Sequence, residues 1–481
     1  MQNEKDPAQW NKAELERFLS GLSYSYQKID LPYGLSTKGV KRPFLLELAF
    51  GRDLEGKTVL DLGSYLGYFC LEACRRKAKH VVGLELDPDR VKEARTLAAI
   101  KGLAPEYRIG DLESLDQSEK YDLVLCLNLL HHLYDPIAAL HKLAGITRDT
   151  LIIEAAGLGR HDRSKLKLPA LLLRYLKNKP VILVRPGIPR IGKSSASQKY
   201  FITEKALVNI LAGHSALFAR VEVFASEFKD RFIIKATRRK IGHLLIVAGP
   251  TSSGKSTFLA TLQEKRLNTS LQEKLPRAAH AWPQIGASKL LNKEKTRQGS
   301  PLPDHYIEGL VLHYDLLRPY TTGTHSYERD QALDLLHCAE KVTVVTLKPP
   351  REQLIRQLQE SELAGSRPAK AKSDRAAGFS GLRPKLKKII STSRKLPLTK
   401  PLKKKIKAIL RPIGLLPTNK SAGHHHKLVI FYQDEQWLES WYDRWAEFIK
   451  QEKSGAANIT AVPAPGKIID WQPEDHHENQ V

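Results

Sequence analysis

Residues 59–69, VLDLGSYLGYF, combine a short apolar run with glycines at positions 63 and 67. Gly63 permits a tight turn with a close backbone approach, and Gly67 lets a following helix start against the strand. A dinucleotide loop also needs a glycine midway between them, where the pyrophosphate touches the backbone. This chain has Tyr65 at that position. The spacing therefore predicts a loop for a cofactor that carries no pyrophosphate.

Three further side chains extend this candidate site. Glu85 ends the next apolar run, where a carboxylate can bind two ribose hydroxyls. Asp111, in YRIGDLE, follows a third strand and could accept from an adenine amino group. His131, in LNLLHHLYDP, follows a strand at the end where open α/β sheets place ligands. We interpret it as a substrate contact or general base, with capping and packing of the pair His131 and His132 as the alternative.

A second loop, GPTSSGKST at residues 249–257, satisfies the pattern GxxxxGK[ST] between an apolar strand and a helical run. Backbone amides of such a loop cradle phosphates. We expect Lys255 to reach the β- and γ-phosphates of ATP and Ser256 to coordinate Mg²⁺. Asp315 is the acid expected to orient this metal, with Glu308 as the alternative. The remaining residues that we assign to the nucleotide are Gly249, Ser252, Ser253, Gly254 and Thr257.

Strand-like and helix-like runs alternate from about residue 57 to 240 and again from 241 to 452. This order predicts an α/β protein in which a Rossmann-like parallel sheet is followed by a second α/β domain that binds a nucleoside triphosphate. We expect four regions: an N-terminal helical region that caps the substrate (1–50), the first domain (51–240), the second domain (241–452), and a polar, Pro-rich, disordered tail (453–481).

The first domain resembles the class I S-adenosylmethionine-dependent methyltransferases in VLDLGSYLGYF, Glu85, GDLE and LNLLHHLYDP, over roughly residues 20–240. The variant DxGxxxG, preceded by YQKIDLPYGLSTKG, is similar to a branch that includes the tRNA wobble-uridine carboxymethyltransferases. The resemblance implies a methyltransferase that binds S-adenosylmethionine. By this resemblance Asp61, Gly63 and Gly67 hold the methionine part, Glu85 the ribose, and Asp111 and Leu112 the adenine. Asn128 lines the site, and the loop residues Ser64 and Tyr65 also bind the cofactor.

The second domain resembles the P-loop kinases of small molecules, in its loop and in VVTLKPPREQLIRQL. Such kinases close an Arg-bearing lid over the phosphates. Arg351 and Arg356 lie where a lid would start, although two solvated helix charges are the more ordinary interpretation.

Basic residues are concentrated in two insertions, although the whole chain carries a net charge of +25. Residues 366–427 contain 18 Lys or Arg and one acid, and the insertion at 157–200 holds 11 Lys or Arg and one acid. Both mix aliphatic with basic residues and contain few aromatic residues. This composition favours an anionic partner, with a membrane surface or a lipid-linked or glycan substrate ranked above RNA, and solvated loops as the alternative.

The N-terminus lacks a secretory signal, no apolar run is long enough to span a membrane, and the four cysteines form no disulfide pattern. We therefore expect a cytoplasmic protein, peripheral to the inner membrane face.

The hypothesis that follows is a bifunctional enzyme. It would combine methyl transfer with ATP-dependent phosphoryl transfer on a cell-envelope glycan or glycolipid precursor. One alternative is an RNA-modifying methyltransferase with an ATP-binding accessory domain. A second alternative is a methyltransferase regulated by a non-catalytic nucleotide switch.

Overall fold

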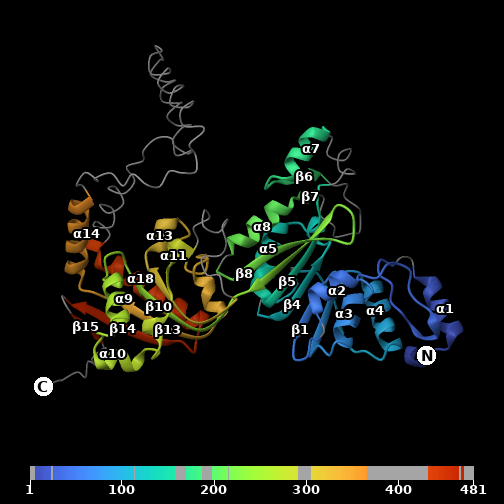
Figure 1. Ribbon diagram of the computed structural model, residues 1–481, viewed down its shortest axis with the longest axis horizontal. Coiled ribbons are helices and arrows are strands. Elements are labelled where there is room, and N and C mark those ends of the chain that lie inside the picture. The colour runs from blue at the N-terminus through green and yellow to red at the C-terminus, as the bar shows by residue number, and fades with distance from the viewer. Residues whose placement is uncertain are drawn as a thin grey trace, which may run out of the picture. The chain divides into compact units, whose positions relative to one another are not determined.

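The computed structural model describes residues 6–22, 25–51, 53–112, 114–116, 118–158, 169–186, 198–214, 216–290, 305–365, 432–464 and 467–470. The chain forms two compact units (Figure 1). Unit 1 comprises Met1–Leu245, Trp282–Leu312 and Glu328–Val342, and unit 2 comprises Ile246–Ala281, His313–Tyr327 and Thr343–Val481.

A seven-stranded sheet forms the centre of unit 1. Its order is β3-β2-β1-β4-β5-β9-β8, in which β1 to β5 are parallel and β9 is antiparallel to both β5 and β8. The strand order reverses between β1 and β4, which is the point where open α/β sheets bind ligands. The strands are β1 (Thr58–Leu62), β2 (His80–Glu85), β3 (Glu106–Ile109), β4 (Tyr121–Leu127), β5 (Thr147–Ala156), β8 (Phe218–Ala225) and β9 (Arg231–Arg238). The predicted Rossmann-like sheet is confirmed.

Helix starts in this unit follow local capping chemistry. Asp87 and Asp135 each accept backbone N–H bonds at the start of a helix whose first residue is proline. The helices are α1 (Lys12–Gly21), α2 (Pro43–Phe50), α3 (Tyr68–Arg75), α4 (Pro88–Ile100), α5 (Pro136–Ile146) and α8 (Glu204–Gly213), with short 3₁₀ helices η1 (Pro7–Gln9), η2 (Pro32–Gly34) and η3 (Leu130–His132).

Apolar side chains from α1 to α4 pack with β1 and β2 in one core cluster. Leu15 of α1 and Leu45 of α2 are both buried there, so the N-terminal region is part of the core of the unit. The helical region predicted at residues 1–50 therefore contributes side chains of both α1 and α2 to the hydrophobic core of unit 1.

The basic insertion of unit 1 contains regular structure. It forms α7 (Ala170–Lys177) and an antiparallel pair of strands, β6 (Ile182–Pro186) and β7 (Gln198–Ile202). Strand β7 packs against η3, and the Tyr200 hydroxyl donates to the carbonyl oxygen of Tyr134 at 2.9 Å.

The second sheet has the order β11-β12-β10-β13-β14-β15. Its strands are β10 (Lys240–Gly249), β11 (Gln284–Gly286), β12 (Tyr306–Asp315), β13 (Ala339–Leu347), β14 (Ala457–Ala464) and β15 (Lys467–Asp470). The helices that follow β9 are α9 (Lys255–Gln263), α10 (Thr269–Lys274), α11 (Ala287–Leu290), α13 (Arg318–Thr322), α14 (Arg351–Gly365) and α18 (Glu435–Glu452), with η4 (Ala279–Ala281) and η5 (Leu333–Cys338).

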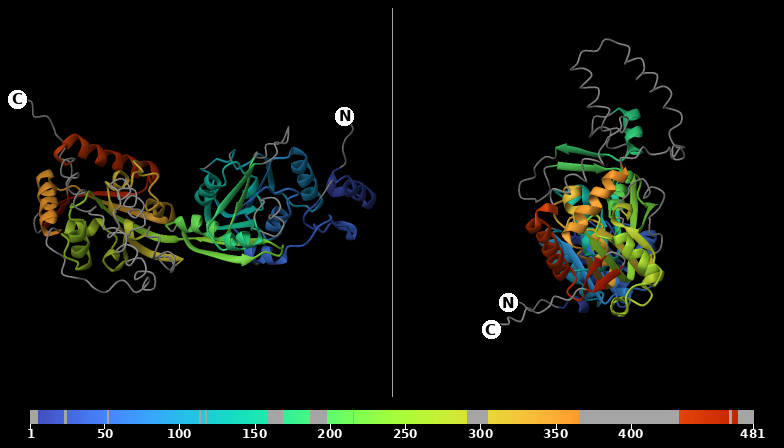
Figure 2. Two further views of the ribbon diagram at one scale, coloured as in Figure 1. Left: turned by 90° about the horizontal axis from the view of Figure 1, so that it is seen from above. Right: turned by 90° about the vertical axis from the view of Figure 1, so that its left-hand side faces the viewer.

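Helix α18, red in Figure 2, carries a row of aromatic residues at helical spacing, which are Trp437, Trp441, Trp445 and Phe448. Trp441, Trp445 and Phe448 are buried, and Trp445 stacks on Tyr314 of β12 with ring centroids 5.3 Å apart. The row is therefore a packing face, as its helical spacing indicates.

The structure differs from the predicted disordered tail. Residues 457–464 pair as β14 with β13 in parallel, and β15 pairs antiparallel with β14. Ile459 and Ala461 are buried, so alternate residues of a short strand pack onto the sheet. The polar, Pro-rich composition around this strand hid its alternation.

The basic insertion predicted at residues 366–427 lies outside the described residues. None of the helices in the described part of the chain combines the length and apolar character needed to cross a bilayer.

Candidate functional site

The loop after β1 adopts left-handed backbone conformations at alternate positions. Gly63, Tyr65 and Gly67 have φ values of 70°, 52° and 77°. The amides of Gly63 and Ser64 both donate to the carbonyl oxygen of Leu84 in β2, at 2.8 and 3.1 Å. The first part of the loop is thereby attached to the neighbouring strand.

Glu85 lies against this loop, where the sequence placed it. One carboxylate oxygen accepts from the Tyr65 amide at 3.0 Å, and the other accepts from the amides of Leu86 and Asp87 at 2.9 and 3.1 Å. Three backbone donors therefore fix the orientation of the carboxylate at the end of β2.

Tyr107 of β3 explains why residues 67 and 83 are glycines, which the sequence alone did not show. A Cβ on Gly67 would lie 1.9 Å from the Tyr107 hydroxyl, and one on Gly83 would lie 2.7 Å from its ring. Both positions must therefore lack a side chain. Among the described residues, the buried Tyr107 hydroxyl and the neighbouring Ser64 Oγ have no hydrogen-bond partner.

Asp111 and Leu112 follow β3, at the same edge of the sheet as Glu85. Asp111 is exposed and accepts from the Ser114 amide at 2.9 Å, while Leu112 is buried. The structure thus brings the predicted adenine residues to the edge that holds the loop.

Asn128 follows β4 in a left-handed conformation, with φ of 57°. Its amide donates to the backbone carbonyl of Glu154 at 2.7 Å, and its side-chain nitrogen donates to the Glu154 carboxylate. Its buried Oδ1 has no partner within the described part of the chain. Glu154 of β5 therefore fixes the Asn128 side chain, and the Asn128 Oδ1 atom is available to accept a hydrogen bond.

Glu154 and Arg42 form a buried ion pair that sequence reasoning missed. Glu154 is 0% exposed and Arg42 is 2% exposed, with Arg42 Nη2 2.6 Å from Glu154 Oε1. Arg42 Nε also donates to Glu227 at 2.7 Å, and its guanidinium lies 4.4 Å from the ring centroid of Phe228. The only sequence signal was an acid inside the apolar strand TLIIEAA.

His131 and His132 form most of η3, four residues beyond the last residue of β4 at the nearest. Their ring centroids are 4.0 Å apart; His131 is partly buried and His132 is exposed. His131 follows Asn128 closely in the sequence. The proposed role of His131 as a base stays a prediction.

The second loop joins β10 to α9. Ser252 and Gly254 have φ of 69° and 83°, and a Cβ on Gly249 would lie 2.3 Å from Ser253 Oγ. Ser256 and Thr257 are exposed in the first turn of α9. The loop therefore leaves the N-terminal end of a helix open to solvent, where anions bind.

Lys255 and Asp315 come together at this loop. Lys255 Nζ donates to the carbonyl oxygens of Gly249 and Pro250 at 2.7 and 2.6 Å and lies 3.8 Å from Asp315 Oδ2. Burial lowers the pKa of Lys255, and the charge of Asp315 opposes this change. Asp315 also accepts from Thr251 Oγ1 at 2.6 Å.

Glu308, the alternative acid, is exposed near the start of β12, whereas Asp315 ends that strand. Arg351 lies 3.5 Å from Glu435 and 3.8 Å from Glu352, which is the arrangement of a surface ion pair. The structure therefore groups Asp315, and not Glu308, with Lys255.

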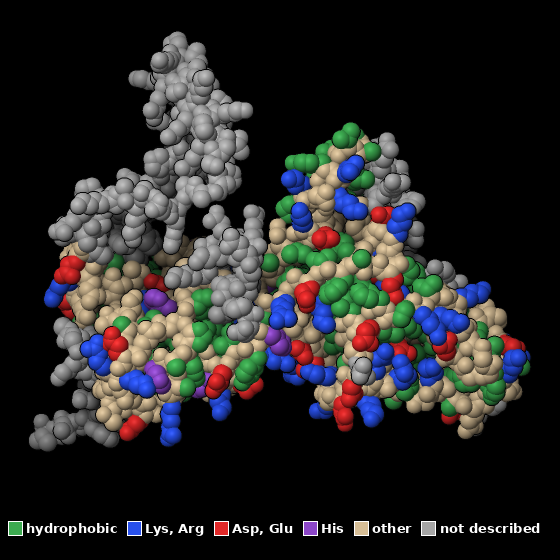
Figure 3. Space-filling view, viewed as in Figure 1, with side chains coloured by type: hydrophobic (Ala, Val, Ile, Leu, Met, Phe, Trp, Pro, Cys, Tyr) green, Lys and Arg blue, Asp and Glu red, His purple; other side chains and the backbone are tan. Residues whose placement is uncertain are grey.

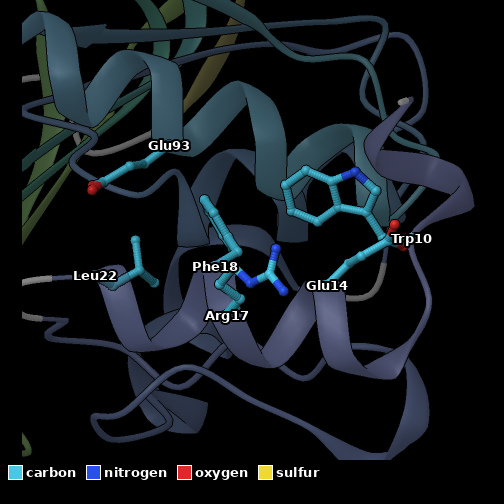
Figure 4. Close-up of a pocket in the computed structure, with 7 residues that line it drawn as sticks. Trp10, Glu14, Arg17, Phe18, Leu22 and Glu93 are labelled. Atoms are coloured by element: carbon cyan, nitrogen blue, oxygen red, sulfur yellow. The ribbon is translucent and has the colours of Figure 1, made fainter. Parts of the chain in front are cut away.

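A cavity of about 440 Å³ lies elsewhere in unit 1, between α1 and α4 (Figure 4). Trp10, Phe18 and Leu22 line it together with the charged side chains of Arg17 and Glu93. None of the residues predicted to act in chemistry contributes to it.

Replacing Arg42 by alanine should lower the free energy of unfolding by about 3–5 kcal/mol, because Glu154 would remain buried without its cation. Urea unfolding measures the change. Lys41→Ala is the matched control, because the Lys41–Asp30 pair is exposed and its loss should change little. The double variant Arg42→Met/Glu154→Met should be more stable than Arg42→Ala. If both variants lost the same free energy of unfolding, lost packing and not the unpaired buried charge would explain the destabilisation.

Burial raises the pKa of Asp61 to about 7 in the folded protein, from the usual 3.8. The protonated carboxyl is therefore favoured by folding, and its contribution is full below about pH 4 and lost as the pH rises to about 7. Across this window Asp61→Asn should gain stability over the natural protein by about 1.4 kcal/mol per pH unit, seen in urea unfolding at several pH values. Asp89→Asn, at an exposed position, is the control. A stability difference for Asp61→Asn that did not vary with pH would contradict the shift.

Residues 59–150 match the family model described as a methyltransferase domain. The ubiquinone biosynthesis O-methyltransferase of Rhodopseudomonas palustris strain TIE-1 is 32% identical over 111 residues, which are 23% of this chain and 44% of that protein. The protein of the same name from Neisseria meningitidis serogroup C strain 053442 is 29% identical over 119 residues, 24% of this chain and 50% of that protein. The chain spans at most half the length of these curated relatives.

Two solved structures are similar in part. The N-terminal domain of EvdMO1, in the presence of SAH and D-fucose, is 19% identical and covers 48% of this chain and 99% of its own, with a TM-score of 0.37. Magnesium protoporphyrin IX methyltransferase from Synechocystis PCC 6803 with bound SAH is 22% identical and covers 40% and 79%, with a TM-score of 0.30. The family match, on the parallel strands described above, identifies a class I S-adenosylmethionine-dependent methyltransferase domain within this chain.

Proposed function

We propose that unit 1 transfers a methyl group from S-adenosylmethionine to an acceptor oxygen. The observation that carries this proposal is the loop from Asp61 to Gly67 joined to the Glu85 carboxylate at the switch point of the sheet. The family match over residues 59–150 supports it.

The residues present suit this cofactor. Glu85 is oriented to accept from ribose hydroxyls, and Asp111 with Leu112 offers an acceptor beside an apolar surface for adenine. The buried Ser64 Oγ and Asn128 Oδ1, which have no partner among the described residues, offer further polar contacts. When bound, the sulfonium supplies a methyl group with a neutral leaving group, so the protein must mainly align the acceptor.

The acceptor we propose is a hydroxyl of a cell-envelope glycan or glycolipid. The names of the curated relatives refer to O-methylation, and the mixed aliphatic and basic insertion suits a lipid-linked molecule. A hydroxyl acceptor must lose a proton, and His131 is the candidate base for that step.

RNA is the second acceptor class, favoured by the net charge and by the similarity to wobble-uridine enzymes. Transfer of label from methyl-labelled cofactor to envelope glycolipid or to bulk tRNA distinguishes the two.

Glu85→Gln should weaken S-adenosylmethionine binding by roughly tenfold to a hundredfold, because a charged acceptor for the ribose hydroxyls is lost. Isothermal titration measures the change, and Gly63→Ala should weaken binding in the same assay because alanine is strained at φ of 70°. Glu55→Gln, at an exposed position outside the loop, is the control. Unchanged binding in Glu85→Gln, with an unchanged Tm, would refute the assignment of Glu85.

We propose a second site for ATP with Mg²⁺ at the loop of residues 249–257, with phosphoryl transfer as its activity. The specific observation is the approach of Lys255, Thr251 and Asp315 at the N-terminal end of α9. In this proposal Lys255 exchanges its backbone carbonyl partners for phosphate oxygens, while Ser256 and Asp315 hold the metal. A nucleotide switch that regulates methylation is the alternative for this site.

Lys255→Ala should weaken binding of MgATP by roughly a hundredfold, since a buried cation that meets the phosphates is removed. Equilibrium binding of a fluorescent ATP analogue measures this, with Lys274→Ala as the control outside the loop. Binding that survives in Lys255→Ala contradicts the site. A phosphorylated acceptor that depends on Lys255 indicates a kinase, whereas altered methylation without any phosphorylated product indicates a switch.

A further inference from the structure

We propose that α7 and the β6–β7 strands dock unit 1 onto a membrane surface that carries anionic headgroups. The docking surface, called the α7 patch, consists of Leu171, Leu172, Tyr175 and Val184 with the cations Arg174, Lys177 and Lys179. This docking does not depend on the methyl-transfer proposal.

The apolar part of the patch is unusually exposed. Leu171 is 86% exposed, Tyr175 60%, Val184 54% and Leu172 41%, whereas Leu173 on the same helix is buried and anchors it. Tyr175 lies four residues after Leu171 and three residues after Leu172, so its ring is next to both leucines on the surface of α7. Figure 3 shows apolar side chains gathered at the tip of unit 1, over α7, with basic side chains among them. A surface of this kind indicates a partner with an apolar interior.

The charges around these residues specify the headgroups. Arg174, Lys177 and Lys179 are exposed, and Lys179 Nζ lies 4.9 Å from the ring centroid of Tyr175. The sequence contains no acid between Asp162 and Glu204, so no negative charge of this segment opposes them. Long basic side chains keep their charges at the headgroups while neighbouring aliphatic side chains enter the acyl region.

A bilayer suits the patch better than a nucleic acid does. Single-stranded nucleic acid is bound by aromatic stacking beside cations, but α7 carries a single aromatic residue and two exposed leucines. Leucine side chains gain nothing from a phosphate backbone, whereas each gains by burial in acyl chains.

The insertion is attached beside the candidate methyl-transfer site. Strand β7 packs against η3, which holds His131, and Tyr200 of β7 bonds to the backbone of Tyr134. Figure 1 shows α7, β6 and β7 together at one end of the seven-stranded sheet. Docking through the α7 patch would therefore hold η3 near the lipid surface, so an acceptor anchored in the membrane could reach the site.

The test uses the full chain with an environment-sensitive fluorophore on Leu171→Cys, because its emission reports on α7 itself. Vesicles of phosphatidylcholine with one quarter phosphatidylglycerol should shift the emission to shorter wavelength, while pure phosphatidylcholine should give a much smaller change. The same label on Val223→Cys, an exposed apolar position of β8, is the control and should not respond. Labelling of the parent chain sets the background from its own cysteines.

Two charge variants and one apolar variant separate the contributions in the same titration. With the label on Leu171→Cys, Arg174→Gln/Lys177→Gln should weaken vesicle binding by roughly tenfold, whereas Lys38→Gln/Lys92→Gln, which removes equal charge from exposed positions outside the insertion, should not. Leu172→Ser should weaken binding to anionic vesicles without changing its dependence on salt. An emission shift with single-stranded RNA but not with vesicles, or no shift with either, would overturn the proposal.

Discussion

The fully buried carboxylate of Glu154 is the constraint around which unit 1 is organised. A charge with no access to water is tolerated only with a cation and further hydrogen bonds, and Glu154 has Arg42 together with Asn128 and Ser226. Arg42 in turn binds Glu227, whose other oxygen accepts from the Phe44 amide at 3.0 Å. One buried acid thus joins the N-terminal region, the end of β4 and the loop between β8 and β9.

This network also explains the conformation of Asn128. A left-handed backbone is uncommon for a residue with a side chain, although asparagine tolerates it better than most. Here both the backbone amide and the side-chain amide of Asn128 are bound by Glu154. The same pair of contacts leaves Oδ1 buried at the edge of the sheet where the cofactor loop lies. The polar site and the buried charge are therefore one structural unit.

Both glycine-containing loops use left-handed backbone conformations, and each is shaped by its own contacts. At residues 61–67 the left-handed Tyr65 packs its ring against Tyr26, with centroids 5.1 Å apart, and lies under the guanidinium of Arg90 at 5.2 Å. These contacts help to offset the strain of its conformation, which costs on the order of 1 kcal/mol. At residues 249–257 the close approach of Ser253 to Gly249 leaves space only for glycine. Nearby side chains therefore constrain both loops, since Tyr107 lies against Gly67 in the first and Ser253 lies against Gly249 in the second.

The sequence by itself determined the α/β class, the alternation of strands and helices up to β5, the loop between β1 and α3, and the position of Glu85 beside it. These features are local: apolar runs, turns and spacings are written in consecutive residues. Only the tertiary structure revealed the Arg42–Glu154 pair, the reason for Gly67 beneath Tyr107, the approach of Asp315 to Lys255, and the strands at residues 457–470. Each of these depends on residues that are far apart in the chain, and a pairing of that kind leaves no periodicity in the sequence. The exposure of α7 belongs to the same class, because a leucine is apolar wherever it occurs and only the folded chain decides which leucines remain in solvent.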